Sequence, residues 1–215
     1  MVSAELLHLW CLGTALVILA GLSAPLGMLA LSIAAVSGPL LLRPELSLLG
    51  SPWMIWIWTI LLALQFLADL YFVPATVKDR PYLHHARVVN AYLHARLQSL
   101  LRPLAAALVL AALPSPLAAQ NAAVLGFICG TALYWGTAWV REQVAISRGS
   151  VILFALEMAK NIIGLMVAAV AGTIPLLVVG MLVCLLVPVA LWAGRLRREQ
   201  LLYPAYGGRI AQKDS

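Results

Sequence analysis

Three ionisable residues lie inside apolar runs of the sequence, where they would act either in chemistry or in helix pairing. Asp69 lies near the end of one run, and Glu157 and Lys160 lie inside another. An ionisable side chain at the middle of a membrane helix costs roughly 2.5 to 3.5 kcal/mol on insertion scales, so it usually faces a partner or a wet cavity. Because Glu157 and Lys160 are three residues apart, one helix face would hold both and allow an ion pair.

Two interpretations of these charges follow. In the first, the charges neutralise one another and hold two helices together. In the second, they line a polar pocket open to the cytoplasm, where Asp69 or Glu157 exchanges a proton or binds a cation or a lipid headgroup. The residues expected at this pocket are Asp69, Glu157, Lys160, Gln65, Asn161, Arg102 and His94.

A second group of polar residues recurs at spacings of three or four between positions 82 and 102. This pattern predicts an amphipathic helix over about 82–101, lying on the inner leaflet with a basic stripe toward anionic lipid. Alternatively, the stripe binds a phosphate headgroup at the pocket mouth, with Arg102 as a forked donor. Its residues are His84, Arg87, Asn90, His94, Gln98 and Arg102.

Signatures of enzymes and of metal or cofactor sites are missing from the sequence. There is no nucleophile elbow, phosphate loop or dinucleotide fingerprint. His84, His85 and His94 match no strong metal motif, so we expect neither metal nor cofactor. A membrane enzyme acting on a phosphorylated lipid through Asp69, His94 and Arg102 is the less favoured alternative.

Composition indicates one integral membrane domain over residues 1–215. The chain is 63% hydrophobic and 10% charged, with a mean hydropathy of +0.98. Its net charge of +6 is divided among the ends of apolar runs, which indicates membrane orientation rather than nucleic-acid binding. Cys11, Cys129 and Cys184 lie in apolar segments and support neither disulfides nor a zinc site.

The apolar runs predict an all-α, polytopic bundle of about six spans. The stretch from Leu6 to Val36 is interrupted by Pro25 and Gly27, which predicts one span followed by a broken or re-entrant piece. A basic C-terminal tail is expected over 195–215. The expected spans are 6–24, 52–73, 103–116, 117–140, 150–171 and 174–193.

The positive charges predict the orientation. With six spans, every Lys and Arg except Arg43 and Lys160 falls on one side of the membrane. The positive-inside rule makes that side cytoplasmic, and an even number of spans puts both termini there. We therefore expect a multi-pass protein of a bacterial inner membrane.

Small residues recur at four-residue intervals in two of the predicted spans. Such faces allow close helix contact, within the bundle or between protomers of an oligomer. Packing within the bundle is the favoured interpretation. The residues are Gly126 and Gly130 in one span, and Gly164, Ala168 and Gly172 in the next.

Short motifs in a fixed order resemble a bacterial membrane family. They are Gly50-Ser51-Pro52-Trp53, Phe66-Leu67-Ala68-Asp69, His94 before Arg102-Pro103, and Ala155-Leu156-Glu157. The chain is similar over most of its length to the domain of unknown function four-one-two-six. The resemblance implies a multi-helix membrane domain with no agreed activity. Gln65 and Leu70 depart from the family pattern, which has an acidic residue and a lysine at these positions.

These features together predict a small transporter or permeability protein. Its substrate would be an ion, a small solute or a lipid headgroup, held in the cytoplasm-facing pocket. The alternative is an accessory or assembly subunit that docks on a partner membrane protein or on a second copy of the chain. Transport requires the buried carboxylates to meet water, whereas a scaffold requires them to be buried and paired.

Overall fold

The computed structural model describes residues 4–37, 40–72, 81–170 and 174–202, and every element within these ranges is a helix. The all-helical prediction is confirmed. Some helical residues, including Asp69 and residues 81–93, have side chains outside the described part. In chain order the elements are α1 (Ala4–Leu22), α2 (Ala24–Val36), the 3-10 helix η1 (Pro44–Gly50), α3 (Pro52–Phe72), α4 (Pro81–Ala112), α5 (Ala119–Val170) and α6 (Pro175–Leu202).

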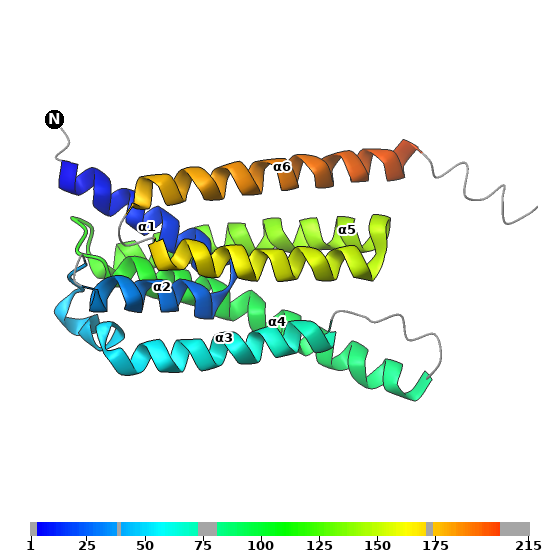
Figure 1. The fold of residues 1–215 in the computed structure, drawn as a ribbon, viewed down its shortest axis with the longest axis horizontal. Coiled ribbons are helices and arrows are strands. Elements are labelled where there is room, and N and C mark those ends of the chain that lie inside the picture. Colours follow the sequence, from blue (N-terminus) through cyan, green and yellow to red (C-terminus); the bar gives the residue numbers. More distant parts are fainter. Residues whose placement is uncertain (1–3, 38–39, 73–80, 171–173, 203–215) are drawn as a thin grey trace, which may run out of the picture.

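The first two helices form a short hairpin. Ser23 adopts an extended conformation (φ −156°, ψ 120°) that ends α1, and a proline occupies the first turn of α2, where its missing N–H is tolerated. The two helices meet so closely that a Cβ on Gly27 would lie 2.5 Å from the backbone nitrogen of Ala20. Figure 1 shows both helices in the half of the molecule that holds the N-terminus. The α1–α2 hairpin therefore begins and ends at the same end of the molecule.

This hairpin is the centre of the hydrophobic core. Most of its leucines from Leu12 onward are almost fully buried, and α3, α4, α5 and α6 contact the hairpin from several sides. The burial explains why both helices lack a polar face. The largest of the buried side chains are those of Leu12, Leu16, Leu19, Leu26, Met28 and Leu31.

Helix α5 doubles back on itself. Arg141 and Glu157 are sixteen residues apart, which in a straight helix would separate them by about 24 Å. Their side chains nevertheless form an ion pair of 3.0 Å, so the chain must reverse between them. Figure 1 shows this reversal, with the green arm running out and the yellow arm returning beside it. We call these the outgoing and returning arms of α5.

The six predicted membrane spans are not supported. Among the described residues, Ala119–Val144 and Val178–Arg198 are long and apolar enough to cross a bilayer, and a third span counts if the bent pair Pro44–Gly50 and Pro52–Ala68 is taken as one. The predicted span over 6–24 corresponds to α1, and the predicted broken piece after it corresponds to α2, a 13-residue helix that folds back on α1. Two to three such helices are compatible with a membrane protein.

Two other predicted boundaries also differ. The interfacial helix over 82–101 and the span over 103–116 form one 32-residue helix, α4, with Pro103 inside it. Proline removes one backbone hydrogen bond, but α4 continues because it packs closely on the outgoing arm at Gly130. At the other end, the predicted tail begins as helix, since α6 extends to Leu202. Residues 203–215 lie outside the described part.

The outer surface of the helices is apolar. Only 11% of the most apolar 18-residue stretch of Ala119–Val144 is buried inside the protein. The corresponding share for Val178–Arg198 is 17%. Trp53, Trp135, Met166 and Leu191 are each more than half exposed. Surfaces of this kind are too extensive for an ordinary soluble monomer and match a lipid-facing exterior.

Arg43 ties the segment before η1 to the connection between α4 and α5. Its Nε donates a hydrogen bond to the Leu113 carbonyl at 2.9 Å, and its Nη2 donates to the carbonyl of Ser115 at 3.2 Å and to that of Leu117. The forked guanidinium thus supplies hydrogen-bond donors to backbone carbonyls that follow the end of α4. The sequence placed Arg43 outside the membrane without a partner.

We expect Arg43→Lys to lower the free energy of unfolding by about 1.5–3 kcal/mol, the usual value of a hydrogen bond to a charged group. A single ammonium lacks the planar fork that reaches several carbonyls. Unfolding by sodium dodecyl sulfate in mixed micelles would measure this difference. Arg197→Lys, on an exposed position of α6, is the matched control and should change little. Equal stability of the two variants would contradict the proposed role of the fork.

Candidate functional site

Glu157 and Lys160 form the ion pair that the sequence predicts. Both lie on the returning arm of α5, and the Lys160 ammonium donates to the Glu157 carboxylate. Glu157 is only 2% exposed, and Lys160 is mostly covered. A buried carboxylate needs such a partner, because removal from water strongly disfavours an isolated charge.

Arg141 also binds Glu157, and sequence reasoning missed this contact. Its Nε lies 3.0 Å from Glu157 Oε1, on the outgoing arm opposite Lys160. Two cations therefore share one carboxylate, and we call Arg141, Glu157 and Lys160 the charged triad. The sequence put Arg141 in a cytoplasmic loop. A long basic side chain at the end of a span can reach back along the helix, but the sequence does not say which acid it meets.

Arg102 extends this charged region to α4. It is only 1% exposed, its Nε donates to Gln98 Oε1 at 3.2 Å, and its guanidinium carbon lies 5.7 Å from the centre of the Tyr134 ring. Cation–π contacts of this type stabilise a desolvated guanidinium. Arg102 is thus buried inside the bundle, although the sequence predicted it at the pocket mouth.

The charged triad lies in the wall of a cavity of about 560 Å³, which we call the triad cavity. Helix α1 contributes Leu22, at the tip of the hairpin, and the rest of the wall comes from both arms of α5 and from α6. Apart from the triad and Thr137, the wall is apolar, with Leu156, Ile163 and Leu186 as typical members. The space exists because the α1–α2 hairpin ends here instead of continuing along the whole length of the bundle.

Two other predicted pocket residues and one further residue of the predicted basic stripe line a different cavity, of about 410 Å³, between α2, α3 and α4. They are Gln65, His94 and Gln98. Gln65 accepts a hydrogen bond from Ser23 Oγ at 3.0 Å, which fastens the hairpin tip to α3. The predicted single pocket is therefore divided between two cavities: Glu157 and Lys160 line the triad cavity, whereas Gln65 and His94 line the cavity of about 410 Å³.

Asn161 follows Lys160 on the returning arm and is 8% exposed. Within the described part of the chain, its Oδ1 has no hydrogen-bond partner. A buried carbonyl oxygen of this kind is uncommon, and each case calls for an explanation such as water or a ligand.

Several predicted residues cannot be placed. The side chains of Asp69, His84, Arg87 and Asn90 lie outside the described part, although their backbones belong to α3 and α4. The meeting of Asp69 with the triad therefore stays a prediction. The same holds for the basic stripe, and for the alternative metal site that needs His84 and His85. Gly172 also lies outside the described residues.

The predicted small-residue faces contact other helices of the same chain. A Cβ on Gly130 would lie 2.7 Å from Ala106 Cβ on α4, and one on Gly126 would lie 2.8 Å from Ala107 Cα. Gly164 meets Leu26 of the hairpin, and Ala168 is buried. Glu157, at helical spacing from Gly164 and Ala168, lies on this inward face. The small residues thus bring the returning arm close enough to bury the carboxylate.

Comparisons with family models, curated proteins and solved structures find no match for this chain. The resemblance to the domain of unknown function four-one-two-six thus stays a proposal. Function has to be argued from the triad and its cavity.

Proposed function

We propose that the chain is a small transporter or permeability protein that binds an anionic solute or headgroup at the charged triad. One observation carries this proposal. Two cations, Arg141 and Lys160, share a single buried carboxylate in the wall of an otherwise apolar cavity. Among the described residues the three groups together have one more positive than negative charge, so an anion would complete them. This argues against a site built for a cation, where an excess of carboxylate oxygens is expected.

The membrane orientation that supports this proposal has the basic end of the bundle in the cytoplasm. Arg195, Arg197 and Arg198 lie in the last turns of α6, and Arg141 lies near the reversal of α5. The positive-inside rule favours the cytoplasm for that end. This arrangement takes α3 together with η1, the outgoing arm of α5 and α6 as membrane spans, because these helices are long and apolar enough to cross a bilayer.

The same arrangement changes the expected side of the N-terminus. Figure 1 shows α1 beginning at one end of the long axis and α6 ending at the other. With the basic end in the cytoplasm, the N-terminus lies on the opposite side, not in the cytoplasm as the sequence indicated. The reason is that the α1–α2 hairpin returns to the end it entered instead of crossing.

A structural role in an assembly subunit is the second candidate. It is favoured by Glu157 itself, which is buried and paired as a scaffold requires. The third candidate, a lipid-modifying enzyme, is disfavoured. His94 and Arg102 are eight residues apart, about 12 Å along α4, which is too far for both to act on one small group.

Removing one cation separates the first two candidates. Lys160→Gln leaves the Arg141–Glu157 pair intact and neutral, so we expect the variant to fold. Flux of inorganic phosphate or a short alkyl phosphate into proteoliposomes should fall by about tenfold or more, the effect of losing one charge-assisted bond of 1.4 kcal/mol or more. Lys160→Arg is the control and should keep most of the flux.

Two results would overturn the anion proposal. One is anion flux that is equal in native protein and in Lys160→Gln while both are folded. The other is a flux of sodium or potassium ions that falls in Lys160→Gln while anions are unaffected. A native mass measurement in gentle detergent tests the assembly candidate, which requires an oligomer or a bound partner.

A further inference from the structure

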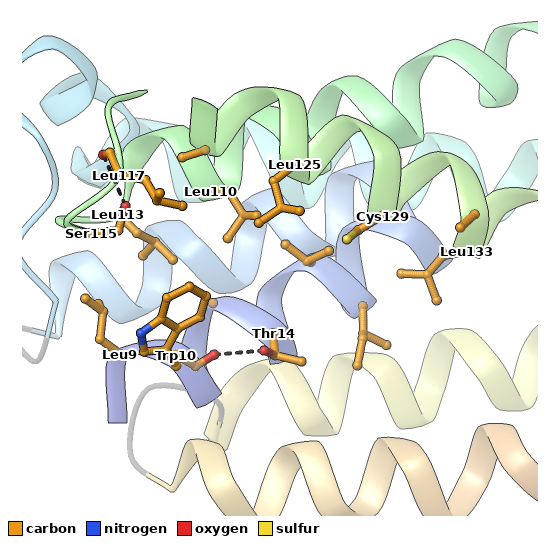
Figure 2. A pocket seen from close by; sticks show the side chains of 15 residues that line it. Leu9, Trp10, Thr14, Leu110, Leu113, Ser115, Leu117, Leu125, Cys129 and Leu133 are labelled. Carbon is orange, nitrogen blue, oxygen red and sulfur yellow. Dashed lines mark hydrogen bonds between the residues drawn. The ribbon is translucent and has the colours of Figure 1, made fainter. Parts of the chain in front are cut away.

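A third cavity lies beside the first helix and has no charged group in its wall. It has a volume of about 390 Å³ and is lined by α1, by the end of α4 and the connection after it, and by the outgoing arm of α5. Figure 2 shows side chains from these three segments converging on it, among them Trp10, Leu110, Leu125 and Cys129. The hydroxyl of Thr14 donates to the Trp10 carbonyl of its own helix at 2.9 Å. We call this space the α1–α5 cavity.

The α1–α5 cavity adjoins the triad cavity. Ala132 and Leu133, on the outgoing arm, line both. At this junction α1 approaches so closely that a Cβ on Gly21 would lie 2.7 Å from Leu133 Cβ. Helix α1 also runs along both cavities: Trp10 lines the α1–α5 cavity and Leu22 lines the triad cavity. The two cavities therefore lie end to end along α1 and α5, separated by the packing of the Leu133 side chain against Gly21.

The combined length of the two cavities suits a hydrocarbon chain. Arg141 lies at the charged end and Cys129 lies in the α1–α5 cavity, and their separation of twelve positions corresponds to about 18 Å of helix. One leaflet of a bilayer is about 15 Å thick in its hydrocarbon part, half of the usual core. A hydrocarbon chain about 18 Å long, slightly more than the thickness of one leaflet, would therefore reach from the triad to Cys129.

We infer that the ligand is an amphiphile with an anionic head and one long alkyl chain. The head binds Arg141 and Lys160 at the triad, and the chain displaces the Leu133 side chain from its contact with Gly21 to enter the α1–α5 cavity. The inference rests on the proposed function and specifies its substrate class. A small anion alone would leave both apolar walls without contacts, and an uncharged hydrocarbon would not compensate the excess positive charge that the described triad carries. An amphiphile satisfies both.

The cysteines of the chain offer a direct test. Cys129 lines the α1–α5 cavity, whereas Cys184 is exposed on α6 and serves as an internal control. The purified protein in detergent is treated with N-ethylmaleimide, and modification of each cysteine is followed by peptide mass spectrometry. The additions are hexadecyl phosphate, butyl phosphate, inorganic phosphate or hexadecanol, each in a separate reaction.

We expect hexadecyl phosphate to slow modification of Cys129 and to leave Cys184 unchanged. At a concentration about ten times the dissociation constant, mass action leaves roughly one site in ten empty, so modification slows about tenfold. Butyl phosphate and inorganic phosphate should bind the triad without shielding Cys129. Lys160→Gln should abolish the protection by hexadecyl phosphate, and Lys160→Arg should retain it.

The outcomes distinguish this inference from the proposed function. If hexadecyl phosphate never protects Cys129 while phosphate flux still depends on Lys160, the path for the chain is wrong and the anion site stands. If hexadecanol protects Cys129 as well as hexadecyl phosphate does, the head has no role at the triad and the inference is overturned. Equal protection of Cys129 and Cys184 would mean a detergent effect and would also overturn it.

Discussion

Replacing Glu157 by glutamine should destabilise the protein more than any other single change in the charged triad. The substitution leaves Arg141 and Lys160 in the wall of an apolar cavity without their shared carboxylate. Removing one partner from a buried ion pair costs about 3–5 kcal/mol, because the remaining charge is uncompensated. Unfolding by sodium dodecyl sulfate in mixed micelles would measure the loss.

Two further variants make this prediction specific. Glu142→Gln removes an exposed carboxylate from the same helix and should change the stability by less than about 0.5 kcal/mol. Glu157→Gln combined with Lys160→Gln removes one negative and one positive charge, and should recover much of the lost stability. If Glu157→Gln is as stable as Glu142→Gln, the triad does not hold the two arms of α5 together.

Replacing Gly27 by alanine should also be strongly destabilising, although alanine is the better helix former. The added Cβ would lie 2.5 Å from the Ala20 backbone nitrogen and still closer to Ala20 Cα, and backbone atoms cannot rotate away. The two helices of the hairpin would have to separate, which loosens the packing at the centre of the core. We expect a loss of about 1–3 kcal/mol, typical of overpacking in a filled interior.

Gly180 of α6 offers the matched control. A Cβ added there meets nothing within 4 Å among the described residues, so Gly180→Ala should gain up to about 1 kcal/mol from helix propensity. The same detergent unfolding assay compares the two variants. A stability of Gly27→Ala at or above that of the native protein would show that the hairpin tolerates a wider spacing. The hairpin would then not define the edge of the triad cavity.

Lys160→Gln and Gly27→Ala test two different features of the triad cavity. The first changes the charge of the triad and keeps one ion pair. The second changes the position of the hairpin tip, where Leu22 lines the triad cavity. Loss of anion flux in both variants, with loss of stability only in Gly27→Ala, is the pattern that the proposed function requires.

The local features of this protein were predictable from the sequence alone. The apolar composition indicates a helical membrane-type chain, and Pro25 and Gly27 indicate a break in the first apolar stretch. The Glu157–Lys160 pair follows from a spacing of three residues on one helix. Each of these depends on residues close together in the chain, where helix geometry alone decides which side chains meet.

The features that make the candidate site depend on tertiary structure. Arg141 reaches Glu157 only because α5 reverses, and Arg102 is buried only because α4 packs so closely on α5 that Tyr134 covers its guanidinium. The sequence could not choose between a hairpin that returns and a span that crosses, because the apolar residues of α1 and α2 suit protein and lipid contacts equally. The register between distant helices decided these contacts, and with them the position of the cavity.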